Sequence, residues 1–88
     1  MMDKDLSSLR SEIDQLDEQL WEIIGKRVDV ARQIGDWKRV HGAPVLQPAR
    51  YQQVLDQALV WGTEKGLSED VIREVMEALH KESVRVES

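Results

Sequence analysis

Apolar residues recur at alternating steps of three and four over the first part of this chain, the spacing that gathers side chains on one seam of a long helix. The seam is formed by Leu6, Leu9, Ile13, Leu16, Leu20, Ile23, Arg27, Val30, Ile34 and Trp37. Arg27 is its one charged member. Because a buried guanidinium keeps its proton, Arg27 requires an anion opposite it, either a carboxylate of the protein or a ligand.

The length of this helix constrains the assembly. A continuous helix over about residues 6–39 is roughly 50 Å long at ~1.5 Å per residue, longer than a compact globule of this size is wide. A chain of 88 residues also has a thin core, since it buries only about 60% of the surface that its unfolded form exposes. We therefore expect the chain to fold as an oligomer.

Glycine, proline and serine divide the rest of the chain into two shorter helices. The residues at 41–44 end the first helix, because they contain a glycine cap followed by proline. Pro48 fits the first turn of a second helix over about residues 48–65, and Ser68 caps a third over about residues 69–87. With no alternating strand pattern or internal repeat, the sequence predicts a single all-α domain of three helices over residues 1–88.

Two details of the first helix are open at this point. Gly25 and Gly35 each cost a helix about 1 kcal/mol relative to alanine, so we expect close backbone approach or a slight bend there. Ser7 and Ser8 are the candidates for its N-cap.

The charge balance argues against several classes of partner. The chain has 17 acidic and 12 basic side chains, with a net charge of −5, and its basic residues are scattered. This leaves no field that would attract nucleic acid or an anionic membrane. There is no apolar run of the ~20 residues that a membrane span needs, the N-terminal residues lack the apolar core of a signal peptide, and cysteine is absent. The cytoplasm is the expected location.

Several polar residues interrupt the predicted apolar faces. Arg27 and Lys38 are eleven residues apart and share a helix face within roughly 20°, so together they could clamp a dianion. Arg10 lies ~25 Å along the axis and ~100° around it from Arg27, and can join the same site only from a partner chain. Ser83 and Glu87 share one face of the third helix.

These residues also have purely structural interpretations. An arginine on an amphipathic helix is usually solvated or paired with a nearby acid, and a serine usually bonds the preceding turn. Glu87 would then be a solvated terminal residue, the tryptophans would be packing residues, and the two histidines lack the spacing of metal ligands. Periodicity alone therefore predicts an oligomeric helical protein with a candidate anion pocket.

The order of these residues resembles the all-helical chorismate mutases. The resemblance begins in the first helix, with residues 9–17 (LRSEIDQLD), Leu20, Lys26-Arg27 and residues 34–38 (IGDWK), and continues through residues 45–50, 65–68 and 80–83. It implies an intertwined homodimer in which each of two active sites takes one arginine from the other protomer. It also implies the Claisen rearrangement of chorismate to prephenate in aromatic amino-acid biosynthesis, a pericyclic reaction that uses no cofactor or metal.

Transferred to this sequence, the resemblance implies a role for each polar residue. Arg10 of the partner chain and Arg27 would bind the two substrate carboxylates, and Lys38 would donate to the ether oxygen, where negative charge develops. Arg50 would orient the substrate, and Ser83 would contact a carboxylate. Catalysis would then consist of holding a near-attack conformer and placing fixed positive charge beside the breaking bond.

Three positions depart from the commonest family pattern. Tyr51 and Gln47 stand where family members often have acidic residues. The acid at the position of Tyr51 binds the substrate hydroxyl in those members. We expect both residues to line the site, with the recognition of the hydroxyl changed. Glu87 stands where many members have a glutamine that donates to the ether oxygen. Because only the protonated acid can donate, a catalytic Glu87 predicts activity that rises as pH falls.

Three other functions are compatible with the sequence. An isochorismate pyruvate lyase uses a similar pocket for a related elimination. A regulatory module would bind chorismate or prephenate without turnover. Residues 48–51 (PARY) and the Glu-Ser ending resemble versions of this domain attached to the enzyme that begins the shikimate pathway, which implies fusion to or association with another enzyme of that pathway. In a purely structural dimer, Arg27→Leu should be stabilising.

Overall fold

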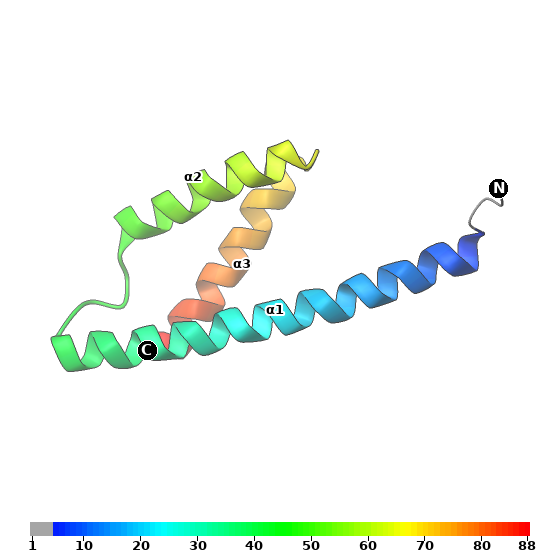
Figure 1. Cartoon of the computed structure of the whole chain (residues 1–88). Coiled ribbons are helices and arrows are strands. Elements are labelled where there is room, and N and C mark those ends of the chain that lie inside the picture. Colours follow the sequence, from blue (N-terminus) through cyan, green and yellow to red (C-terminus); the bar gives the residue numbers. More distant parts are fainter. Residues whose placement is uncertain (1–4) are drawn as a thin grey trace.

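The computed structural model describes residues 5–88 and contains three α-helices (Figure 1). α1 spans Leu6–His41, α2 spans Pro48–Glu64 and α3 spans Glu69–Glu87. The described residues contain no strand, so the predicted all-α fold is confirmed. α1 continues two residues beyond the expected end, because Gly42 and not an earlier residue closes it. Residues 1–4, part of the segment examined above for a signal peptide, lie outside the described residues.

Local chemistry explains both ends of α1. The prediction that Ser7 or Ser8 caps the helix is wrong, because the carboxylate of Asp5 accepts from the backbone N–H of Ser8 at 2.8 Å. An anionic oxygen suits the positive end of the helix better than a hydroxyl does. This hydrogen bond holds the pKa of Asp5 below its usual value. At the other end, Gly42 adopts φ 65°, and its N–H donates to the carbonyl of Lys38.

The two shorter helices begin as expected. Pro48 occupies the first turn of α2, where its missing N–H leaves no intrahelical bond unmade. The hydroxyl of Ser68 accepts from the N–H of Val71 at 3.3 Å and caps α3. Between them Gly66, with φ 81°, provides a tight turn that folds α3 back along α2.

The helices are arranged with α3 in the middle. Both α1 and α2 pack on α3, whereas α1 makes no close backbone approach to α2 over the described residues. Figure 1 shows the N-terminal half of α1 projecting beyond the other two helices. The molecule measures 60 × 23 × 16 Å, with a radius of gyration of 16.8 Å, against about 12 Å for a compact domain of this length.

This arrangement leaves a thin core. Among the described residues only Ala31, Leu55 and Ile72 are buried hydrophobic side chains. The chain exposes 7208 Å², whereas a compact monomer of its mass exposes about 5,300 Å². The apolar seam of α1 contributes to this extra exposed surface. Six of its residues are exposed in the single chain: Leu6, Leu9, Ile13, Leu16, Leu20 and Ile23. None of the described helices is long and apolar enough to cross a membrane.

The closest backbone approach in the fold occurs where the end of α3 meets α1. A Cβ atom built on Gly35 would lie 2.7 Å from the Cα and 3.0 Å from the carbonyl oxygen of Glu87. Only glycine fits at this crossing, because the obstructing atoms are main chain. Gly25, which lies ten residues earlier in the same helix, has nothing within 4 Å of a Cβ atom built on it. Of the two glycines that the sequence singled out, Gly35 is therefore the one that the packing within this chain requires.

These two glycines should respond to alanine in opposite directions. Gly35→Ala should lower the free energy of unfolding by about 1–3 kcal/mol, because the new methyl group overpacks the α1–α3 crossing. Gly25→Ala is the matched control and should raise it by about 0.5–1 kcal/mol through helix propensity alone. Urea unfolding followed by circular dichroism measures both. Equal effects of the two substitutions would contradict the crossing described here.

Candidate active site

An open cavity of about 810 Å³ lies between the three helices and the loop that joins α1 to α2. Seven of the eight residues that the sequence predicted for the site line this cavity, although they come from all three helices and the loop. They are Arg27, Lys38, Gln47, Arg50, Tyr51, Ser83 and Glu87.

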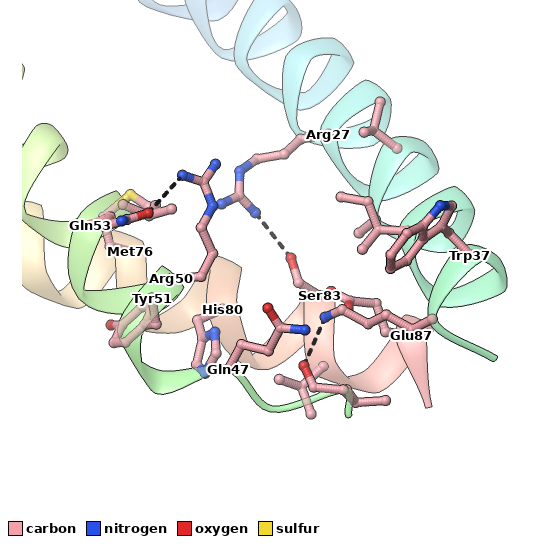
Figure 2. Close-up of a pocket in the computed structure, with 17 residues that line it drawn as sticks. Arg27, Trp37, Gln47, Arg50, Tyr51, Gln53, Met76, His80, Ser83 and Glu87 are labelled. Atoms are coloured by element: carbon pink, nitrogen blue, oxygen red, sulfur yellow. Dashed lines mark hydrogen bonds and ion pairs between the residues drawn. The ribbon is translucent and has the colours of Figure 1, made fainter. Parts of the chain in front are cut away.

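Arg27 projects from α1 into the cavity, half-buried. Its Nη1 donates to the hydroxyl of Ser83 at 3.0 Å, across from α1 to α3 (Figure 2). The serine therefore bonds a side chain of another helix and not its own preceding turn. A hydroxyl carries no charge, and within the described part of the chain no carboxylate forms an ion pair with Arg27. Of the two anions that Arg27 could require, the protein carboxylate is not found in this part of the chain.

Arg50 approaches the same space from the first turn of α2. Figure 2 shows its guanidinium group beside that of Arg27, each pointing into the cavity. Its closest hydrogen-bond partner is the amide oxygen of Gln53, at 3.5 Å, and no ion pair with a carboxylate is found for it among residues 5–88. Two neighbouring cations without a counter-charge repel one another, so an anion placed between them is stabilised.

Lys38 and Glu87 form an ion pair at the opposite wall. The Lys38 Nζ lies 2.5 Å from the Glu87 Oε1 and donates to the carbonyl of Val45 at 2.8 Å. Their side chains are only 12% and 10% exposed, so the interpretation of Glu87 as a solvated terminal residue is wrong. An ammonium group has three N–H donors. Two of them are engaged here, and the third remains for a ligand.

The end of α3 is held in place for this pair. The Nη1 of Arg39 lies 3.4 Å from the carbonyl oxygen of Glu87, and Gly35 lets the backbone of Glu87 rest directly on α1. The ion pair therefore depends on a close backbone crossing between residues far apart in the sequence.

Uncharged polar side chains form the remaining wall. The ring of Tyr51 stacks on that of His80 with centroids 4.1 Å apart and planes inclined by 27°. The Nε2 of Gln47 donates to the carbonyl of Pro44 at 3.2 Å. His80 belongs to a segment that resembles the family and lacks the spacing of a metal ligand, but it was not predicted as a site residue. Its position three residues before Ser83 puts both on one face of α3.

Trp37 also lines the cavity. It was expected to pack in the core and an interface, and it is 56% exposed in the single chain, so the interface part of that expectation stays a prediction. Its ring stacks on His41, with centroids 4.0 Å apart. It is therefore not part of the core of this chain.

Arg10 is the one predicted residue that does not line the cavity. It is exposed on the projecting half of α1, ~25 Å along the helix axis from Arg27. Because α1 is unbroken between the two residues, no rearrangement within one straight helix brings them together.

The cavity as a whole is suited to a small dianion. Three cationic side chains and one carboxylate face it, which leaves two positive charges uncompensated among its lining residues. Uncharged hydrogen-bonding groups stand beside the cations. Such a site can bind two carboxylates and place a fixed positive charge at a third point, without a nucleophile of its own.

Comparison with known proteins gives several relatives. The chain is 36% identical over 78 residues to the T-protein of Haemophilus influenzae, covering 89% of this chain and 21% of that protein. It is 34% identical over 83 residues to the 4-amino-4-deoxychorismate mutase of Streptomyces venezuelae, covering 94% of this chain and 81% of that protein.

A third relative is the bifunctional chorismate mutase/prephenate dehydratase of Aquifex aeolicus, 30% identical over 56 residues, which covers 64% of this chain and 16% of that protein. The chain thus spans about a fifth of the first relative's length and most of the second's. Residues 9–88 match the family model described as chorismate mutase type II. Since this match covers nearly the whole chain, the protein belongs to the chorismate mutase type II family.

Proposed function

We propose that this domain catalyses the rearrangement of chorismate to prephenate in the cavity described above. The observation that carries the proposal is the pair of guanidinium groups, Arg27 and Arg50, that face one another with no carboxylate of the described chain between them. Chorismate has two carboxylates, an ether oxygen and a ring hydroxyl. Its two negative charges can compensate positive charges that the lining residues leave unpaired. Family membership supports the same reaction.

A second copy of the chain completes the site in this proposal. The exposed seam of α1 and an excess surface of about 1,900 Å² over a compact monomer favour an obligate homodimer, whose interfaces are large and apolar. In a two-fold dimer each projecting half of α1 lies on the other protomer. The partner's Arg10 then binds one carboxylate, while Arg27, held by Ser83, binds the other. Arg50 orients the ring between them.

The reaction is an intramolecular rearrangement, and it needs no redox group or nucleophile from the protein. One carbon–oxygen bond breaks and one carbon–carbon bond forms within the substrate, and negative charge develops on the ether oxygen. The third N–H of Lys38 donates to that oxygen, because its other two are held by Glu87 and Val45. The guanidinium groups restrain the two carboxylates so that the reacting carbons meet.

The bifunctional relative supports a link to a second enzyme. We propose that this domain works fused to or associated with another enzyme of aromatic amino-acid biosynthesis. Prephenate formed here would then pass to the next reaction.

Replacing the seam arginine should separate activity from stability. Arg27→Leu should lower kcat/KM by about 10²–10³-fold, since one fixed charge is lost, while the unfolding midpoint stays the same or rises. Arg32→Leu is the matched control, because Arg32 pairs with Asp29 on the exposed side of the same helix. The assay follows the loss of chorismate absorbance, with prephenate identified as product.

Other outcomes of that assay would redirect the proposal. Pyruvate released from isochorismate, with chorismate unchanged, would favour the lyase. Tight binding of chorismate without turnover would favour the regulatory module.

Mixing two inactive variants should restore activity if the site spans two chains. Arg10→Ala and Arg27→Ala homodimers should each be inactive. Unfolded and refolded together, they should recover about a quarter of the wild-type rate, because half of the dimers are mixed and each has one intact site. Refolding either variant alone is the control. No recovery from folded mixed dimers would mean that Arg10 and Arg27 serve the same chain's site.

The glutamate at the ether position should limit the rate. A carboxylate cannot donate to the ether oxygen, and here Glu87 is ion-paired to Lys38. Glu87→Gln supplies an amide donor at the same place and removes the ion pair, so we expect kcat at neutral pH to rise about tenfold. Glu82→Gln, on the exposed side of α3, is the matched control. An unchanged kcat in Glu87→Gln would remove Glu87 from the proposed chemistry.

A further inference from the structure

The uncharged wall of the cavity helps to decide which of two related substrates the site accepts, chorismate or 4-amino-4-deoxychorismate. Chorismate has a hydroxyl on its ring where 4-amino-4-deoxychorismate has an amino group, which is largely an ammonium ion at neutral pH. The relatives include proteins named for the second compound. A site that accepts one of these groups can be built to reject the other, because one is neutral and the other is a cation.

Gln47 offers an oriented acceptor at this wall. Its Nε2 donates to the carbonyl of Pro44 at 3.2 Å, and this hydrogen bond orients the amide of an otherwise exposed side chain. Figure 2 shows the amide directed into the cavity between His80 and Ser83, with its oxygen on the cavity side. No hydrogen bond from a described donor to that oxygen is found. It can therefore accept from a ligand without giving up an existing bond.

The aromatic stack next to Gln47 adds no negative charge. Tyr51 and His80 both line the cavity, and their rings are held face to face, which restricts their movement. Neither side chain carries a carboxylate. This part of the wall therefore offers hydrogen bonds and contact area, but nothing that would compensate a cation.

The charges around the rest of the cavity also disfavour a cationic substituent. Arg27, Lys38 and Arg50 are positive, and Glu87, the one carboxylate among the lining residues, is engaged by Lys38. An ammonium group on the substrate would add a further positive charge and meet no free carboxylate there. A hydroxyl group donates to Gln47 with no such penalty.

We propose that Gln47, beside the stacked Tyr51 and His80, reads the ring hydroxyl of the substrate and makes this enzyme select it over an ammonium group. This inference rests on the proposed function and narrows its substrate class to the hydroxyl compound. Gln47 is thus a specificity-determining residue that acts by accepting one hydrogen bond and by being neutral.

The test compares kcat/KM for chorismate and for 4-amino-4-deoxychorismate in matched variants. The wild-type enzyme should prefer chorismate by about tenfold or more. Gln47→Glu, which has the same shape but a negative charge, should shift the ratio at least about tenfold toward the amino compound. Gln47→Leu removes the acceptor and adds no charge, so it should lower kcat/KM for chorismate about tenfold without creating a preference for the amino compound.

Gln57→Glu is the control for added charge. It lies seven residues after Arg50, two turns further along the same face of α2 and outside the cavity, and it should leave the ratio unchanged. A wild-type preference for the amino compound, or a ratio that Gln47→Glu does not move, would overturn this inference while leaving the mutase proposal intact. If the wild-type protein rearranges neither compound, the proposed function itself fails.

Discussion

Arg27 and Arg50 bring two positive charges together in one cavity, and much of the structure depends on how that arrangement is maintained. Side chains that repel one another need a rigid support, and α3 provides it by packing against both helices that carry them. Ser83 of α3 also fixes the direction of the Arg27 side chain through a neutral oxygen, so the charge is held in place without being cancelled. The free protein thus keeps a positive site ready for an anion.

The Lys38–Glu87 pair shows a different treatment of charge in the same cavity. There a carboxylate is supplied by the chain itself, and both side chains are nearly enclosed. The close crossing at Gly35 makes this possible, since any larger residue would push the end of α3 away from α1. The ion pair in the cavity and the packing of α3 on α1 therefore both involve Glu87, the last residue of α3.

The sequence predicts local features of this fold better than contacts between helices. The steps of three and four identify α1, and Pro48 and Ser68 mark the starts of α2 and α3, because these signals act within a few residues. The cap at Asp5 was missed, since several polar residues lie near the start of α1 and only geometry selects one of them.

Contacts between distant residues lie beyond that kind of prediction. Arg27 stood out from its seam, but its bond to Ser83 joins residues 56 apart, and the ion pair of Lys38 joins residues 49 apart. His80 was not predicted as a site residue because one histidine carries no spacing pattern, and its place in the wall depends on the packing of α2 on α3, which brings Tyr51 onto its ring. The role of Arg10 stays a prediction, because the proposed site reaches this residue only through a second chain.

The most direct test of this account is a crystal structure of the protein with a dicarboxylate analogue of the cyclic transition state. The account predicts a two-fold dimer in which the partner's Arg10 and Arg27 each donate to one carboxylate, with Arg50 beside the ring and Lys38 on the ether oxygen. A ligand bound by Arg27 and Arg50 within one chain, with Arg10 of both chains in solvent, would contradict the shared site.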